Sequence, residues 1–385
     1  MIRHSYAFEL ITPCFCGGAN PSEEAEIRPA SIRGQLRWWF RVLGGFQSLA
    51  AKTPPMSLRE QEDFIFGAAA GDEGNAGKLM VRVAGASLRS TNPKNAEDLA
   101  IGPDDARGYL LFPLRRQGGN DGKRGVFLAD GGEHGSFTLH LQWRGDPSMG
   151  ADLRALLTVF GHIGSLGFRS RRAMGALRLV HSPFSLKEAL MRFSSPSGIV
   201  VFSQDFPPGL SSEKGAVRKL AEWLRDWRQH GRSNTLAARP PTNSGFDWAL
   251  RDHDEGVEAL TGTWPAFSPS GRTPKGANHE TFRPALGLPI EQRFMALGNR
   301  KAFWDKLYSR RLAGGRGSGR FASPVLLRPH YDGTAWSAYV IFVDARTWTP
   351  GEPVFVQGLT KAVSLDLYDA MKNSLATSPA WHKLH

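Results

Sequence analysis

The stretch SIRGQLRWWFRVLG, residues 31–44, has the spacing of an amphipathic helix. Its predicted buried side consists of Leu36, Trp39, Phe40 and Leu43. Ser31 is predicted to be the N-cap, and Gly44 with Gly45 would end the helix. The preceding stretch YAFELIT, residues 6–12, alternates like a strand. The chain is therefore expected to begin with a strand followed by a helix.

The next elements continue this order as far as residue 182. Periodicity predicts helices at 58–66 and 152–163, and strands at 78–84, 109–114, 137–143 and 176–180. The order βαββαβ is that of a ferredoxin-like, or RRM-like, α+β domain. We therefore predict such a domain over residues 1–182, interrupted by long Gly/Pro-rich insertions.

The remaining residues, 183–385, predict a second and more divergent ferredoxin-like domain. A strong helix is expected at 212–230, strands at 321–327 and 338–344, and a helix at 359–375. Between them, residues 232–284 are polar and rich in Pro and Gly, which favours an irregular insertion.

Composition points to a polyanionic partner. The 385 residues carry a formal net charge of +12, from 48 Lys and Arg against 36 Asp and Glu. No apolar run approaches the roughly 20 residues that a membrane-spanning helix needs, and the N-terminus lacks the core of a signal peptide. We therefore expect a cytoplasmic protein without a membrane partner, whose two cysteines, Cys14 and Cys16, are reduced thiols.

The helix at 31–44 carries a row of arginines. Arg33, Arg37 and Arg41 follow one another at i+4 steps, so their guanidinium groups would lie about 6 Å apart along the axis. Such a row suits a chain of phosphates, because arginine donates paired hydrogen bonds to phosphate oxygens. No acidic residue occurs from Ile27 to Gln47, which disfavours an ordinary solvated helix face.

A second basic motif is HIGSLGFRSRRAMG, residues 162–175. Its glycines, including Gly164 and Gly167, would let the backbone approach a ligand, while three arginines follow in the same loop. The glycine pattern is that of neither a dinucleotide fingerprint nor a nucleoside triphosphate loop. A third cluster, residues 310–320, fits a flexible linker as well as a nucleic-acid contact. The predicted RNA-binding residues are Arg28, Arg33, Arg37, Arg41, Gly164, Gly167, Arg169, Arg171, Arg172, Arg316 and Arg320.

Four segments together resemble the RAMP superfamily of CRISPR proteins. They are ELITPCFCGGA at 9–19, EIRPASIRGQLRWWFR at 26–41, GSLGFRSRRAMGALRL at 164–179 and RFASPVLLRP at 320–329. They look most like the first-numbered RAMP module of type III-B effector complexes, the Cmr family. Two features depart from the family pattern: Ala173 and Met174 replace a glycine and a bulky residue of many members, and residues 232–284 do not align.

The resemblance implies an RNA-binding subunit of a type III-B ribonucleoprotein used in antiviral defence. It would hold the 3′ part of a guide RNA, help to capture target RNA, and assemble with other RAMP subunits. The alternative is a RAMP-type endoribonuclease that processes guide RNA with His162 as acid and base. A single histidine at the end of an amphipathic helix is more often structural, so no catalytic residue is assigned.

No cofactor or metal ion is predicted either. Cys14 and Cys16 lack a second Cys/His pair at zinc spacing, and His253 with Asp254 lacks the further partners of a metal phosphohydrolase site.

Overall fold

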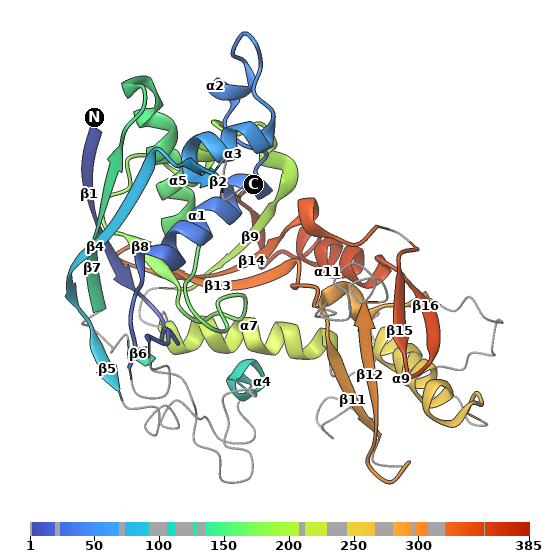
Figure 1. Cartoon of the computed structure of the whole chain (residues 1–385). Coiled ribbons are helices and arrows are strands. Elements are labelled where there is room, and N and C mark those ends of the chain that lie inside the picture. The colour runs from blue at the N-terminus through green and yellow to red at the C-terminus, as the bar shows by residue number, and fades with distance from the viewer. Residues whose placement is uncertain are drawn as a thin grey trace. The chain divides into compact units, whose positions relative to one another are not determined.

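We describe a computed structural model of the chain (Figure 1). It describes residues 2–19, 24–68, 74–91, 106–111, 126–128, 135–207, 212–228, 245–265, 280–294, 297–306, 320–349 and 351–385. The chain divides into two compact units: residues 1–221, 326–345 and 380–385 form the first, and residues 222–325 and 346–379 form the second. The predicted domain boundary at residue 182 falls inside the first unit and stays a prediction.

The first unit contains an antiparallel sheet in which strands distant in sequence are neighbours. Its order is β4-β7-β1-β8, with strands β1 (Ile2–Leu10), β4 (Leu79–Ser87), β7 (Gly135–Trp143) and β8 (Leu177–Leu179). β7 alternates strictly between buried and half-buried residues, which is the pattern of a strand with one face on a core. Its register with β1 pairs Phe8 with Phe137, and the two rings stack.

Two long helices contribute to the core of this unit. α1 (Pro29–Val42) packs against α5 (Gly150–Ile163), and α5 also contacts β8. The predicted apolar side of α1 is buried as expected, at Leu36, Trp39, Phe40 and Leu43. The helix α3 (Leu58–Phe66) has the bounds that the sequence predicts, because Ser57 and Glu60 form a capping box at its start.

A second four-stranded sheet in the first unit shares this core. Its order is β13-β14-β9-β17, with strands β9 (Val200–Asp205), β13 (Val325–Tyr331), β14 (Trp336–Phe342) and β17 (His382–Lys383). By sequence rank both sheets have the order second, third, first, fourth. The predicted α+β class is confirmed, whereas the assignment of two ferredoxin-like domains stays a prediction.

The second unit is built on a five-stranded sheet of order β10-β16-β15-β12-β11. These strands are β10 (Glu280–Thr281), β11 (Ile290–Phe294), β12 (Arg300–Lys306), β15 (Pro353–Val356) and β16 (Leu359–Val363). The helix α9 (Gly245–Thr261) contacts β12 and β10, and α11 (Asp366–Ala376) contacts the short 3-10 helix at Arg283–Leu286.

Shorter elements complete the described chain. The helices are α2 (Gln47–Ala50), α4 (Arg107–Leu111), α6 (Leu186–Leu190) and α7 (Glu213–Arg228), and the strands are β2 (Gly67–Ala68), β3 (Asn75–Ala76), β5 (Arg89–Thr91) and β6 (Val126–Leu128). Further 3-10 turns occupy Pro147–Met149, Pro196–Gly198 and Asp344–Arg346.

Three local predictions are wrong. Residues 109–111 belong to helix α4 rather than to a strand, and 112–114 lie outside the described residues. In the helix expected at 359–375, residues 359–363 form strand β16 instead, while residues 366–375 lie in helix α11 as expected. The described part of the stretch expected to be irregular, 232–284, contains α9. In the first two cases a short or interrupted apolar pattern does not decide between helix and strand, and in the third the polar, Pro- and Gly-rich composition of the whole stretch hides the helical part.

Among the described residues, no helix is long and apolar enough to cross a membrane.

Candidate functional site

The helix α1 begins two residues earlier than the sequence predicts. Arg28, not Ser31, is the N-cap, and it makes no side-chain cap hydrogen bond. Pro29 occupies the first helical position, which its fixed φ and missing N–H suit. Arg28 is exposed, so its charge stands at the positive end of the helix dipole. The helix ends where Gly44 and Gly45 adopt positive φ angles of 75° and 78°, as predicted.

The row of arginines on α1 is in place, and it is engaged within the protein. Arg37 and Arg41 both donate hydrogen bonds to the carboxylate of Glu62 on α3, and Arg33 donates to the backbone carbonyl of Phe66. Burial raises the pKa of the Glu62 carboxyl, but the bonds from Arg41 and Arg37 outweigh it and hold the pKa below its ordinary value. The acidic partner that α1 lacks in its own sequence therefore comes from α3.

Gly164 and Gly167 are needed because other parts of the protein pack closely against them, not because a ligand surface is open there. A Cβ on Gly164 would lie 2.4 Å from the ring and carbonyl of Phe160, and one on Gly167 would lie 2.8 Å from the carbonyl oxygen of Phe15. Gly167 also has a φ of 78°. Ala173 adopts a φ of 70°, so this departure from the family pattern keeps the left-handed conformation that a glycine would favour.

The three arginines of this loop have different surroundings. Arg169 donates to the carbonyl of Leu110 over 2.6 Å, and Arg172 is buried, at 8% exposure. Arg171 is half-buried, and its guanidinium carbon lies 5.1 Å from the centroid of the Trp38 ring on α1. The loop joins the edge of β13, because Ala173 donates to Leu327 and Leu327 donates to Arg171. Two motifs about 130 residues apart in sequence thus meet.

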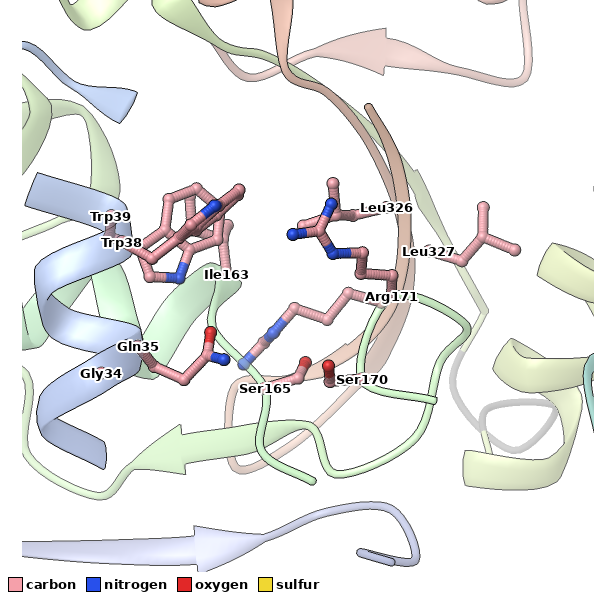
Figure 2. A pocket seen from close by; sticks show the side chains of 11 residues that line it. Gly34, Gln35, Trp38, Trp39, Ile163, Ser165, Ser170, Arg171, Leu326 and Leu327 are labelled. Carbon is pink, nitrogen blue, oxygen red and sulfur yellow. The ribbon is translucent and has the colours of Figure 1, made fainter. Parts of the chain in front are cut away.

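A cavity of about 180 Å³ lies where they meet, and all its walls belong to the first unit. Figure 2 shows Gln35, Trp38 and Trp39 of α1 on one side and Arg171 and Leu326 on the other, with the hydroxyls of Ser165 and Ser170 between them. The complete lining is Gly34, Gln35, Trp38, Trp39, Ile163, Ser165, Ser170, Arg171, Leu326, Leu327 and Arg328. No acidic side chain is among these residues.

Arg328 on β13 is a residue of this site that the sequence reasoning missed. It is 1% exposed and donates to the carbonyls of Gly161 and Gly164, over 2.7 and 2.9 Å, and to that of Leu177. Burial lowers its pKa to about 9, so the guanidinium stays charged at neutral pH. It therefore places a cation at the C-terminal end of α5, where the helix dipole is negative.

His162 lies beside this arginine. Its ring stacks on His330 with the centroids 5.3 Å apart, and His330 stacks in turn on Tyr339 at 4.6 Å. Burial, together with the charge of Arg328, lowers the pKa of His162 to about 4. Burial also holds the pKa of His330 well below its ordinary value. Both rings are therefore neutral at physiological pH.

Of the predicted RNA-binding residues that the structure describes, Arg171 alone is among those that line this cavity. Arg320 is exposed and belongs to the second unit, and Arg316 lies outside the described residues. Within the described chain, no group of three His, Cys, Asp or Glu side chains could hold a metal ion. Cys14 and Cys16 are free and buried, with their Sγ atoms 2.8 Å apart.

Comparison with known proteins finds similarity to one family model and to two curated proteins. The model of the RAMP superfamily matches residues 7–178. The chain is 28% identical over 194 residues to the CRISPR system Cmr subunit Cmr1-1 of Pyrococcus furiosus, a match of 49% of this chain and 51% of that protein. It is 26% identical over 189 residues to Cmr1-2 of the same organism, covering 46% of this chain and 96% of that one. The alignment thus spans about half the length of Cmr1-1.

The structural comparison agrees with these sequence matches. The crystal structure of apo Cmr1 from Pyrococcus furiosus superposes with a TM-score of 0.52 and 15% sequence identity, covering 100% of this chain and 98% of that one. The match of the RAMP superfamily model to residues 7–178 and the similarity to both curated relatives show that this chain is homologous to the Cmr1 subunits of Pyrococcus furiosus.

Proposed function

We propose that this protein is a non-catalytic, RNA-binding subunit of a type III-B CRISPR ribonucleoprotein in the cytoplasm. The observation that carries the proposal is the meeting of α1 and the 164–175 loop around one cavity whose charged lining residues, Arg171 and Arg328, are cations. The net charge of +12 favours a polyanionic ligand. The two relatives to which the chain is homologous are named as Cmr subunits of a CRISPR system. Other subunits of such a complex are therefore the protein partners that we propose.

Within such a complex, the RNA held at this surface would be the 3′ part of the guide, close enough to help in capturing target RNA. Arg28 and Arg171 are the best placed of the predicted contacts. Arg28 is exposed at the start of α1, and Arg171 lines the cavity. Arg37 and Arg41 are bound to Glu62, so phosphate contacts there would have to share their guanidinium groups with that carboxylate.

The environment of His162 supports a binder over a nuclease. A general acid and base works best with a pKa near the operating pH, and the pKa of His162 is about 4. Its ring is also stacked on His330, and its neighbour Arg328 disfavours the protonated form.

The test is fluorescence anisotropy of the full chain with labelled single-stranded RNA across a range of salt concentrations. Each arginine that contacts a phosphate adds about 0.7 to the slope of log affinity against log salt. Arg171→Gln should weaken binding and reduce the slope, whereas Arg144→Gln, an exposed arginine after β7, should change neither by as much. Equal effects of the two substitutions would show that Arg171 is no special contact. RNA binding that is absent at low salt would refute the proposal.

Cleavage is measured in the same samples. The RNA should stay intact with and without divalent cations. Site-specific cleavage that disappears in His162→Phe would instead establish the endoribonuclease. The partners and the guide are tested by purifying the complex from its native host and sequencing the RNA that remains bound. A guide with a repeat-derived tag, whose 3′ part crosslinks to this chain, is the expected result.

A further inference from the structure

We propose that the cavity between α1 and the 164–175 loop holds one unstacked base of single-stranded RNA. This inference rests on the proposed RNA-binding function and specifies which part of the RNA the cavity takes. Unpaired bases are commonly recognised by stacking on aromatic rings and by hydrogen bonds along their edges. The cavity offers both, because Trp38 and Trp39 supply aromatic surface and Gln35, Ser165 and Ser170 supply polar groups (Figure 2).

The size of the cavity suits a small planar group. At about 180 Å³ it exceeds the roughly 30 Å³ of one water molecule and is smaller than the roughly 300 Å³ at which pockets for drug-sized ligands begin. A single base is flat and compact, whereas a whole nucleotide with its sugar and phosphate is larger. The sugar and phosphate would therefore stay outside.

The hydrogen-bonding groups that line the cavity complement those along the edge of a base. An amide such as that of Gln35 both donates and accepts, as each base edge does. The hydroxyl groups of Ser165 and Ser170, which also line the cavity, can likewise both donate and accept hydrogen bonds.

The planar face of Arg171 can meet a base even where the edge of the same guanidinium meets a phosphate, whereas Arg328 is engaged with the protein. Arg328 already donates to the carbonyls of Gly161, Gly164 and Leu177, so its donors face the protein. The guanidinium of Arg171 lies over the ring of Trp38, which is a stacking arrangement. Planar guanidinium and indole groups together form the kind of surface on which bases stack.

Gly34 supplies an independent observation. It occupies the interior of α1, where glycine is disfavoured relative to alanine, and it is exposed at the cavity. A Cβ added there would meet no described atom within 4 Å apart from its chain neighbours and the backbone of its own helix. The fold therefore gives no reason for glycine at this position. Close approach of a ligand to the helix backbone does give one.

The experiment compares short RNAs that differ only in their bases. The full chain is titrated with oligonucleotides of about ten residues, built from a stable abasic ribose analogue and carrying no base, one central base, or all bases. We expect the single base to tighten binding by about 5- to 150-fold over the fully abasic strand, as base stacking does in other single-strand binders. A gain below twofold overturns the base pocket. Binding of the fully based strand then still upholds the proposed function, whereas no binding by any strand refutes both.

Gly34→Ala is the decisive variant, because alanine favours the helix and a loss of binding could not be attributed to misfolding. It should raise the melting temperature by about 2 °C through better helix propensity and yet abolish most of the gain from the single base. Ser31→Ala is the matched control: it is exposed on the same helix, outside the cavity lining, and should leave the gain unchanged. A single-base gain in Gly34→Ala equal to that of the unmodified protein would place the base elsewhere and overturn the inference.

Discussion

Arg41 of α1 donates two hydrogen bonds to the carboxylate of Glu62 on α3. The side chain of Glu62 is 8% exposed and that of Arg41 is 42% exposed, so the pair joins a nearly buried acid to a half-exposed base. Arg37 donates to the same carboxylate. One acidic side chain thus fixes two members of the arginine row, and α3 sets the direction in which these guanidinium groups point.

We expect Glu62→Gln to destabilise the fold, because two half-buried cations then lose their shared partner. Hydrogen bonds to a charged group contribute about 1.5–3 kcal/mol, and the exposure of the arginines moderates the loss, so the free energy of unfolding should fall by about 2 kcal/mol. Urea denaturation measures this. Glu60→Gln, an exposed capping-box position where glutamine also serves, is the matched control and should change little.

The cost of Glu62→Gln should depend on pH. The pKa of Glu62 in the folded protein lies below its ordinary value, so its contribution is complete above about pH 4.3 and is lost as the pH falls through the folded-state pKa. The difference in unfolding free energy between Glu62→Gln and the unmodified protein should therefore shrink between pH 7 and pH 3. A difference that stays constant over this range would mean that the carboxylate charge contributes nothing.

The pairing with Glu62 also marks a limit of sequence reasoning. The i+4 spacing of Arg33, Arg37 and Arg41 is local and was predicted correctly, but the acid that binds two of them comes from another helix. Helix α3 itself was predicted with its bounds from periodicity, which is a local signal, and in the structure a capping box marks its start. Which side chains of two helices meet is decided by packing, which no local pattern contains.

Arg328 at the cavity is a second residue whose contacts no local sequence pattern reveals. A single arginine in a strand is ordinarily expected to point into solvent. Strand β13, however, is buried along almost its whole length. The apolar run VLL at 325–327 directly before it was the available signal, because a charge that continues a buried run must be satisfied inside the protein. Residues of both α1 and the 164–175 loop line one cavity, whereas their contact with RNA stays a prediction.

The stacked histidines should make stability fall in mild acid. The pKa of His162 is about 4 in the folded protein and about 6.5 in the unfolded chain, so the unfolded state binds more protons between these values. Stability is therefore lost as the pH falls from 6.5 towards 4. Relative to the unmodified protein, His162→Phe should gain about 2 kcal/mol on going from pH 7.5 to pH 5. Phenylalanine keeps a ring against His330, and urea midpoints at the two pH values provide the measurement. Parallel curves for the two proteins would refute this.

Arg328→Met should be the most destabilising of these substitutions. It leaves the carbonyls of Gly161, Gly164 and Leu177 without their donor, and an unsatisfied buried carbonyl costs about 1–3 kcal/mol. Removing a buried charge recovers part of this, because burial disfavours the cation, as the lowered pKa of Arg328 shows. We expect a net loss of about 3 kcal/mol. Arg328→Lys should recover only part of it, since one ammonium group cannot reproduce the planar fork of donors. An unfolding free energy in Arg328→Met equal to that of the unmodified protein would mean that the cost of burying the charge cancels the three hydrogen bonds.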